Sequence, residues 1–262
     1  AGGSSGYSHV STLSTLGMQK VVDLPGLVSG QVTAMTGNST HIWAATGGIG
    51  QGGNGASSGA GLLQGTFQPN GDVEWEYGWT MGSNSRGTDF HLQGDDLFIA
   101  TTPTGLMKLD VLNKNLIPIN GALHTKFDQM KLYNNHLIIG LAGEGGSPPG
   151  VQTFDLNNQQ FDVGRLIAGL PSNIVNGFDA SSNIMYIGTN GGIGRFNYST
   201  SDWMDSITTS SGLQNNVIED VLVIGTKAYF ATPSGLIIWD EITETSTLMD
   251  TSDGLMATST WG

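Results

Sequence analysis

Hydrophobic residues come in short bursts along this chain, and the bursts recur at a regular spacing. Each burst is a near-continuous apolar run that is rich in β-branched and aromatic side chains. Runs of this kind are typical of strands buried on both faces. They are HIWAAT from His41, DLFIAT from Asp96, HLIIGL from His136, IMYIGT from Ile184 and KAYFAT from Lys227.

Each burst is flanked by further strand signals. A run that begins with glycine follows most bursts, as in GIGRFN from Gly192 and GLIIWD from Gly235, and predicts the next strand. The Asp or Asn that ends this run opens a turn, because its side chain caps the backbone and tolerates positive φ. A shorter, more polar segment then predicts an exposed outer strand. Before each burst, a ten-residue phrase ends in another strand, most clearly in GLPSNIVNGF and GLQNNVIEDV.

The ten-residue phrase sets the period of a repeat. Its copies are separated by about 40–55 residues, and each copy introduces four strand signals, which is the period of a β-propeller blade. We therefore predict an all-β propeller built from four-stranded antiparallel sheets. The copies begin at Gly26, Met81, Gly121, Gly169 and Gly212, with a shortened copy, GLMATSTWG, at Gly254.

The two ends of the sequence fit parts of one further blade. Residues 6–24 match the third and fourth strands, and the segment from Gly254 matches the first. We predict a single domain over residues 1–262 with six blades, in which residues 1–25 and 254–262 form a shared closing blade. That blade lacks a visible second strand. Either it has three strands, or another chain supplies the fourth, or the chain is a piece of a longer repeat array.

Composition limits the classes of partner. The sequence has 40 glycines and 12% charged residues, which suits many turns and short strands. The net charge of −13 disfavours nucleic acid and anionic membrane surfaces, since both need a basic footprint. The absence of cysteine excludes disulfides, thiolate zinc sites and cysteine nucleophiles. No apolar run approaches the roughly 20 residues of a membrane span, so no membrane insertion is expected.

The clearest repeat resembles a known family. GLPSNIVNGFDASSNIMYIGTNGGIGRF is similar to the two-component-regulator propeller repeat, and the Gly212 copy is a good second match. The resemblance implies a β-propeller in an extracellular or periplasmic setting, acting as a sensory or scaffold part of a larger protein, often in glycan detection. A second resemblance, to streptogramin-lyase-type propellers, lacks the His and acidic residues on which that family relies.

Two insertions break the period and mark a candidate ligand face. Residues 47–61 read GGIGQGGNGASSGAG and residues 143–150 read GEGGSPPG, both in the turn between the second and third strands. That turn shares a face with the connections between blades, and long loops in compact repeats are often functional. A disordered Gly/Ser tract is the alternative. The candidate ligand-face residues are Gly50, Gly53, Asn54 and Glu144, with Trp75 and Trp79 added from the neighbouring outer strand.

The aromatic residues divide into two groups. Trp43, Tyr186 and Tyr229 repeat in register within the apolar bursts and are expected in the core between blades, as are Phe154, Phe196 and Trp239 in the following strands. In VEWEYGWT, the residues Trp75, Tyr77 and Trp79 alternate, so they are expected to share one face of their strand. Such a face could stack on sugar rings or pack against a neighbouring blade.

Acidic residues fall on the first strand of several blades. Asp89, Asp128, Glu219 and Asp220, together with Thr33, Thr88 and Asn176, are expected to line an axial channel. Converging carboxylates could bind Ca²⁺, which prefers oxygen ligands. A solvated channel with scattered acids is the alternative, and the sequence contains no D-x-D-x-D-G loop.

The histidines offer one acid–base grouping. His91 follows Asp89, and His124 lies near Asp128, so His91, His124 and Asp128 are the candidate catalytic residues. Surface decoration is the alternative, because no G-x-S-x-G or H-E-x-x-H signature is present.

Three hypotheses about function follow. The first is a non-enzymatic extracellular binding, sensory or scaffold propeller that presents the Gly-rich face to a carbohydrate or small-molecule ligand. The second is a propeller lyase or hydrolase acting on a glycan or small molecule. The third is a structural surface-protein fragment. Other domains of a longer parent chain, or a second copy at the broken blade, are the expected protein partners.

Overall fold

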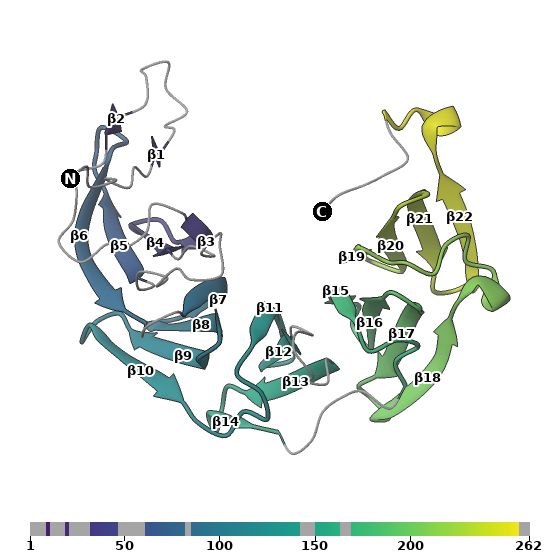
Figure 1. Cartoon of the computed structure of the whole chain (residues 1–262), viewed down its shortest axis with the longest axis horizontal. Helices are drawn as coiled ribbons and strands as arrows, with labels where there is room; N and C mark the ends of the chain where they lie inside the picture. The colour runs from purple at the N-terminus through teal and green to yellow at the C-terminus, as the bar shows by residue number, and fades with distance from the viewer. Residues whose placement is uncertain are drawn as a thin grey trace, which may run out of the picture. The chain divides into compact units, whose positions relative to one another are not determined.

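The computed structural model describes residues 32–46, 61–81, 85–141, 150–162 and 169–256, together with two short strands near the N-terminus (Figure 1). These strands, β1 (His9–Val10) and β2 (Gln19–Lys20), pair antiparallel with each other. The chain divides into two compact units, Ala1–Met130 and Lys131–Gly262, and the division falls inside one strand. The expectation of a single domain over residues 1–262 stays a prediction.

The first unit contains two complete four-stranded antiparallel sheets within its described residues. In each sheet the strands follow one another in chain order, as in the blade of a propeller. The first sheet consists of β3 (Val32–Gly37), β4 (His41–Thr46), β5 (Gly61–Phe67) and β6 (Val73–Thr80). The second consists of β7 (Arg86–Gln93), β8 (Asp96–Thr102), β9 (Gly105–Asp110) and β10 (Asn115–Ile119).

Three further sheets of the same design follow, and the first of them begins with the strand that carries the division between the units. Its strands are β11 (Phe127–Tyr133), β12 (His136–Leu141), β13 (Gly150–Asp155) and β14 (Gln160–Phe161). The next sheet consists of β15 (Val175–Ala180), β16 (Ile184–Thr189), β17 (Gly192–Asn197) and β18 (Asp202–Ile207). The last consists of β19 (Asp220–Ile224), β20 (Lys227–Thr232), β21 (Gly235–Asp240) and β22 (Thr245–Met249).

The predicted all-β propeller fold is confirmed at the level of these repeated sheets. Each apolar burst is the second strand of a sheet, and each glycine-led run is the third. The number of blades remains a prediction, because most of residues 1–25 and 257–262 lie outside the described part of the chain.

Alternate side chains of a second strand face opposite neighbours. Ile184 and Tyr186 of β16 belong to a buried cluster with β20 and β21 of the following sheet. Met185 and Ile187, on the other face of β16, belong to a cluster with β12 and β13 of the preceding sheet. All six residues of β16 are buried as a result. This is why the sequence shows an unbroken apolar run and not an alternating one.

The first strands of three sheets contain a β-bulge, and the extra residue ties its sheet to the next. The register shifts at Thr33, Thr88 and Asn176, each of which is left outside the pairing with the second strand. The side chain freed in this way donates to a backbone carbonyl of the following sheet or of the segment that leads into it. The bonds run from Thr33 to Gly87 O at 2.5 Å, from Thr88 to Phe127 O at 2.9 Å and from Asn176 to Ile218 O at 2.7 Å.

In four of the five described sheets, the turns between third and fourth strands share one construction. The Asp or Asn at the end of the third strand accepts the N–H two residues further on, as the sequence predicts; the bonds are Asp110 to Leu112, Asp155 to Asn157, Asn197 to Ser199 and Asp240 to Ile242. The positive φ, however, falls four residues after the acceptor. It lies at Lys114, Gln159, Ser201 and Glu244, with values of 51–58°.

Candidate functional site

Two sets of loops meet at one end of the second unit. The connection that leads into each first strand lies against the turn between the second and third strands: Asn190 N donates to Ile174 O at 3.3 Å, and Asn215 Nδ2 donates to Ser234 Oγ at 2.8 Å. The connection before β19 contains a short 3-10 turn, η1 (Thr209–Ser211) (Figure 1). We refer to residues 169–174, 190–191, 208–218 and 233–234 as the loop face.

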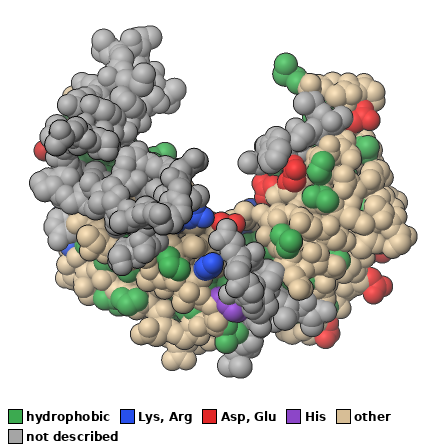
Figure 2. All heavy atoms as spheres, in the orientation of Figure 1, with side chains coloured by type: hydrophobic (Ala, Val, Ile, Leu, Met, Phe, Trp, Pro, Cys, Tyr) green, Lys and Arg blue, Asp and Glu red, His purple; other side chains and the backbone are tan. Residues whose placement is uncertain are grey.

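The loop face is neutral and rich in hydrogen-bonding groups. Its four segments contain no Lys, Arg, Asp or Glu and read GLPSNI, NG, TTSSGLQNNVI and PS. Two aliphatic side chains project from it at equal repeat positions, Ile174 at 48% exposure and Val217 at 36%. On the second unit's surface seen in Figure 2, single hydrophobic and acidic side chains lie among backbone and side chains of other types.

Side-chain amides hold the loop face in place. Asn176 Nδ2 donates to Asn190 Oδ1 at 2.7 Å, in addition to its bond to Ile218 O. Asn216 Oδ1 accepts from Thr209 N at 2.8 Å, and Asn216 Nδ2 donates to Thr209 Oγ1 at 3.2 Å. Since an amide both donates and accepts, such loops suit a ligand that also does both, as sugar hydroxyls do.

The acid–base candidates lie in the first unit. His91 is half-buried on β7, and burial lowers its pKa, while the Asp89 charge opposes the shift. Asp89 itself accepts two backbone N–H groups, from Phe90 at 2.8 Å and from Met130 at 2.7 Å. These bonds tie the first strand of one sheet to the first strand of the next. Asp89 is the charged residue that acts on His91.

The remaining acidic candidates are placed separately. Asp128 is exposed on β11, and His124 lies in the loop before that strand. In the second unit, Asp220 packs so closely on Gly177 that an added Cβ there would lie 2.6 Å from Asp220 Oδ1. One carboxylate oxygen of Glu219 is buried. Among the described residues, no group of three or more His, Asp or Glu side chains is arranged to hold a metal ion.

The aromatic face expected on β6 is split in two. A register shift between Gln64 and Gly65 places one extra residue of β6 in the pairing, so Trp75 and Trp79 point to opposite faces. Trp79 Nε1 donates to Lys114 O of the second sheet at 3.0 Å. The Trp75 ring lies against Gly65 instead. The expectation of one shared face was therefore wrong, because a bulge reverses the alternation.

The other ligand-face candidates, Gly50, Gly53, Asn54 and Glu144, lie outside the described residues.

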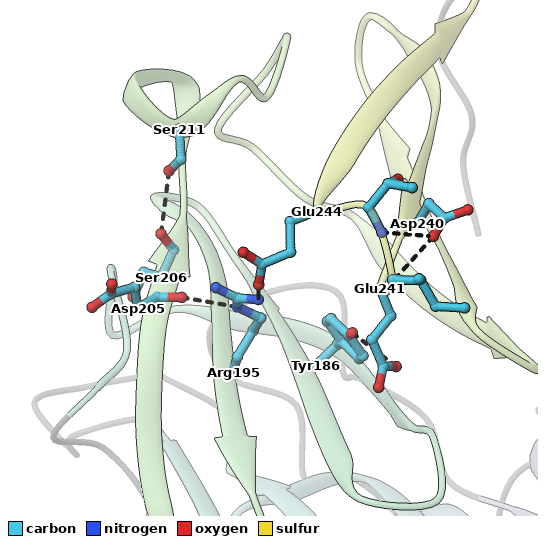
Figure 3. A network of polar contacts seen from close by, with 10 residues as sticks. Tyr186, Arg195, Asp205, Ser206, Ser211, Asp240, Glu241 and Glu244 are labelled. Carbon is cyan, nitrogen blue, oxygen red and sulfur yellow. Dashed lines mark hydrogen bonds and ion pairs between the residues drawn. The ribbon is translucent and has the colours of Figure 1, made fainter.

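A buried polar network that the sequence did not indicate joins the last two sheets (Figure 3). Arg195 of β17 is 7% exposed and donates to Asp205 O at 2.9 Å and to Glu244 Oε1 at 3.0 Å. Its guanidinium also lies over the Trp239 ring, 5.6 Å from the centroid. Tyr186 donates to Glu241 Oε2 at 3.1 Å. Burial, followed by the Glu241 charge, raises the pKa of Tyr186, so this phenol stays protonated.

No protein-family model matches the sequence, and no curated protein matches it. Solved structures are similar in fold. The extracellular domain of a B. thetaiotaomicron protein assigned as a one-component system has a TM-score of 0.59 and 17% identity, over 98% of this chain and 32% of its own. The extracellular domain of a protein from the same organism, assigned as a hybrid two-component system, has a TM-score of 0.56 and 16% identity, over 97% and 32%.

A third similar structure is PorZ, a bacterial surface component of the type-IX secretion system of Porphyromonas gingivalis. It has a TM-score of 0.56 and 10% identity, over 85% of this chain and 28% of its own. The chain therefore spans about a third of the length of each of these structures. At these identities the likeness establishes the propeller-type fold. Among the described residues, no helix has the length and hydrophobicity of a membrane span.

Proposed function

We propose that this chain is a non-enzymatic binding or scaffold propeller that works outside the cell, as part of a sensory or surface protein. The similar structures support the setting, because two are extracellular domains of signalling proteins and one is a surface component. The sequence resemblance to the two-component-regulator repeat points the same way. Since the chain spans about a third of those proteins, it would supply the recognition or scaffold part of a larger one.

The ligand we propose is a neutral, hydroxyl-rich molecule such as a glycan, taken at the loop face. The observation that carries this proposal is the composition of that face, where amides and hydroxyls surround two exposed aliphatic side chains and no segment carries a charge. Binding sites of this kind combine apolar contact area with a few polar groups that fix orientation.

The test is titration of the protein with a panel of neutral polysaccharides, using matched isoleucine variants. Ile174→Ala removes an exposed side chain of the loop face, while Ile242→Ala removes one that is 76% exposed in the turn after β21. We expect Ile174→Ala to weaken binding about fivefold, which corresponds to roughly 1 kcal/mol, and Ile242→Ala to leave it unchanged. Failure to bind any neutral saccharide, or equal losses in both variants, would contradict the proposal.

Deletion of residues 50–59 tests the Gly-rich insertion separately. We expect weaker binding of the same polysaccharide, with an unchanged melting temperature because the deletion falls between the end of β4 and the start of β5 and removes no residue of either strand. Unchanged binding would remove that insertion from the ligand face and leave the second-unit loops as the site.

The alternative of a lyase or hydrolase rests on His91. Its lowered pKa keeps the imidazole neutral near pH 7, which a general base requires. If the chain cleaves a polysaccharide that it binds, His91→Gln should abolish cleavage while leaving binding intact. Cleavage at an unchanged rate in this variant would exclude His91 as the base.

A further inference from the structure

The first unit contains a group of loops that carries positive charge and no acid. Its segments are residues 85–86, 102–104 and 120–126, which read SR, TPT and NGALHTK, and we refer to them as the cationic loops. Arg86, His124 and Lys126 lie in these loops, whereas Asp and Glu are absent from them. Since the whole chain has 22 acidic residues against 9 Lys and Arg, the cationic loops differ in charge from the rest of the sequence.

Arg86 and Lys126 lie on either side of Thr102. Arg86 and Thr102 are directly opposite each other in the pairing of β7 with β8, where Cα atoms are about 5 Å apart. Thr102 Oγ1 in turn donates to Phe127 O at 2.8 Å, and Phe127 is the residue after Lys126. The Cα atoms of the two cations are therefore separated by roughly two strand spacings, about 10 Å, which their long side chains can span to reach one ligand.

Further contacts hold the three segments together. Thr104, in the turn between β8 and β9, forms a hydrogen bond with Ser85, which is 3% exposed. The 120–126 loop packs on Gly105 at the end of this turn, since an added Cβ there would lie 3.7 Å from Thr125 Cα and 3.9 Å from His124 O. The loops that carry the cations are thus fixed against one turn.

Strand alternation turns Arg86 toward the side on which Lys126 lies. Its neighbour Gly87 faces the preceding sheet, because an added Cβ there would lie 2.5 Å from Ala45 Cβ. Successive residues of a strand point to opposite faces, so Arg86 faces the following sheet, as does the paired Thr102. Among the described residues, no acidic side chain forms an ion pair with Arg86. Its guanidinium is therefore available to a ligand.

The two cations occupy a repeat position that is aliphatic in the second unit. This position directly precedes the residue whose carbonyl accepts a hydrogen bond from a side chain of the sheet before it. The residues there are Arg86 before Gly87, Lys126 before Phe127 and Val217 before Ile218. Val217 is one of the exposed aliphatic side chains of the loop face. The two units therefore present different chemistry at equal positions, which predicts that they contact different ligand groups.

We propose that the cationic loops bind an oxyanion, a carboxylate or sulfate group, between Arg86 and Lys126. A guanidinium donates two parallel N–H bonds to such a group, and a lysine ammonium adds a second charge from another direction. Hydrogen bonds of this kind are roughly twice as strong as those between neutral groups. The proposal does not depend on the binding of a neutral ligand at the loop face.

The surrounding charge limits the ligand to one oxyanion. Asp128 lies two residues beyond Lys126 and is exposed, and the net charge of the chain is −13. A polyanion such as nucleic acid would be repelled along its length, because its binding requires a broad basic surface. Two cations in loops without acids suit instead a small acid or a single charged residue of a saccharide, such as a uronic acid.

The test is calorimetric titration with a galacturonate trimer at about 20 mM NaCl, where screening is weak, in matched variants that each remove one positive charge. We expect Arg86→Gln and Lys126→Gln each to weaken binding about tenfold, since each removes a charge-assisted contact. Lys227→Gln is the control, because Lys227 is exposed on β20 in the second unit and its loss changes the net charge equally. Equal losses in all three variants, or no binding of the trimer, would overturn the proposal.

Two further variants of the experiment separate the oxyanion contact from other effects. Arg86→Lys keeps the charge without the paired N–H geometry and should lose less affinity than Arg86→Gln. Melting temperatures show whether each variant is folded, and Lys126→Gln, which lies outside the strands, carries the test if Arg86→Gln is unstable. A loss in Arg86→Lys as large as in Arg86→Gln, together with no loss in Lys126→Gln, would overturn the proposal.

Inorganic sulfate and a neutral galactose trimer distinguish the sources of binding. Sulfate should displace the galacturonate trimer; an affinity for sulfate equal to that for the trimer would assign the site to a free anion, and a lower one to an acidic saccharide. Failure of sulfate to displace the trimer would overturn the proposal of an oxyanion site. Binding of the neutral trimer should be unchanged in Arg86→Gln, so failure of the loop face and failure of the cationic loops give different results.

Discussion

Several polar residues of a kind that can act in catalysis form hydrogen bonds between neighbouring sheets here, and we call these bonds ties between sheets. Asp89 and Thr88 bond to the backbone of the sheet that follows them. Asp179 accepts from Val223 N at 2.8 Å and lies 3.5 Å from Lys131 Nζ, so it connects first strands on both sides. Bonds of this kind satisfy backbone groups that a first strand, which lies at the edge of its sheet, leaves unpaired. A carboxylate in a first strand is therefore weak evidence for catalysis in this fold.

The contribution of such a tie to stability can be measured most directly at Arg195. Removing it in Arg195→Ala leaves Glu244 and the Asp205 carbonyl without their donor and takes away the contact with Trp239. We expect the free energy of unfolding to fall by about 2–4 kcal/mol, because the guanidinium is buried and donates two hydrogen bonds. Urea unfolding followed by tryptophan fluorescence would measure the change.

Glu244→Gln is the matched control for Arg195→Ala. The Glu244 side chain is 60% exposed, so its charge contributes little across the ion pair. We expect a loss below about 0.5 kcal/mol. A loss as large as that of Arg195→Ala would mean that the ion pair, and not the buried guanidinium with its other contacts, dominates this network.

His91 gives the stability a pH dependence of known sign. Burial lowers its folded pKa below the ordinary value of 6.5, so the unfolded chain binds the proton more readily. The contribution of neutral His91 to the free energy of unfolding is therefore complete above pH 6.5. It is lost as the pH falls from 6.5 toward the folded pKa. Melting temperatures measured between pH 7.5 and 5 should fall less in His91→Gln than in the parent protein. Identical dependence of the melting temperature on pH in the two proteins would contradict a lowered pKa for His91.

At the scale of the element, the turns after the third strands carry a repeated strain. Ser201 adopts φ 58° at an exposed position, where an L residue with a Cβ is disfavoured by about 1 kcal/mol. We expect Ser201→Gly to raise the free energy of unfolding by about 0.5–1 kcal/mol, since glycine adopts this conformation without the steric cost. Thermal unfolding would measure the gain.

Ser199→Gly in the same turn should have the opposite effect. Ser199 Oγ donates to Asn197 Oδ1 at 2.6 Å, and its backbone lies outside the positive-φ region. Glycine there would lose this bond and add flexibility to the unfolded chain. A stabilisation by both substitutions would show that the positive φ at Ser201 is not the source of the gain.

The elements differ in how far the sequence predicts them. The bounds of β4 and β16 follow from the apolar bursts, because burial on both faces leaves no polar interruption. The bulge in β6 could not be predicted, since one extra residue in a pairing leaves no mark in the alternation of Trp75 and Trp79. Arg195 was missed for a similar reason. Its partner Glu244 lies 49 residues away, and only the stacking of two sheets brings them together.

For the whole molecule, the net charge of −13 is the dominant electrostatic feature. Self-repulsion among excess acidic groups destabilises a compact state, and added salt screens it. Raising NaCl from 20 to 200 mM, roughly a threefold change in screening length, should therefore raise the melting temperature by a few degrees. The loop face, which carries no charged side chain, should bind its ligand with little dependence on salt.

Calcium provides the decisive comparison at this scale. If Asp89, Asp128, Glu219 and Asp220 held Ca²⁺, a concentration 100 times the dissociation constant would add about 2.7 kcal/mol of stability. Asp89 already accepts two backbone N–H groups, and the described His, Asp and Glu side chains form no three-residue cluster suited to a metal. We therefore expect CaCl₂ and MgCl₂ at equal ionic strength to shift the melting temperature equally, as screening of the net charge requires. A rise specific to Ca²⁺, lost in Asp128→Asn or Asp220→Asn, would show a calcium site that includes first-strand acids, and the role of those acids as ties between sheets would then be secondary.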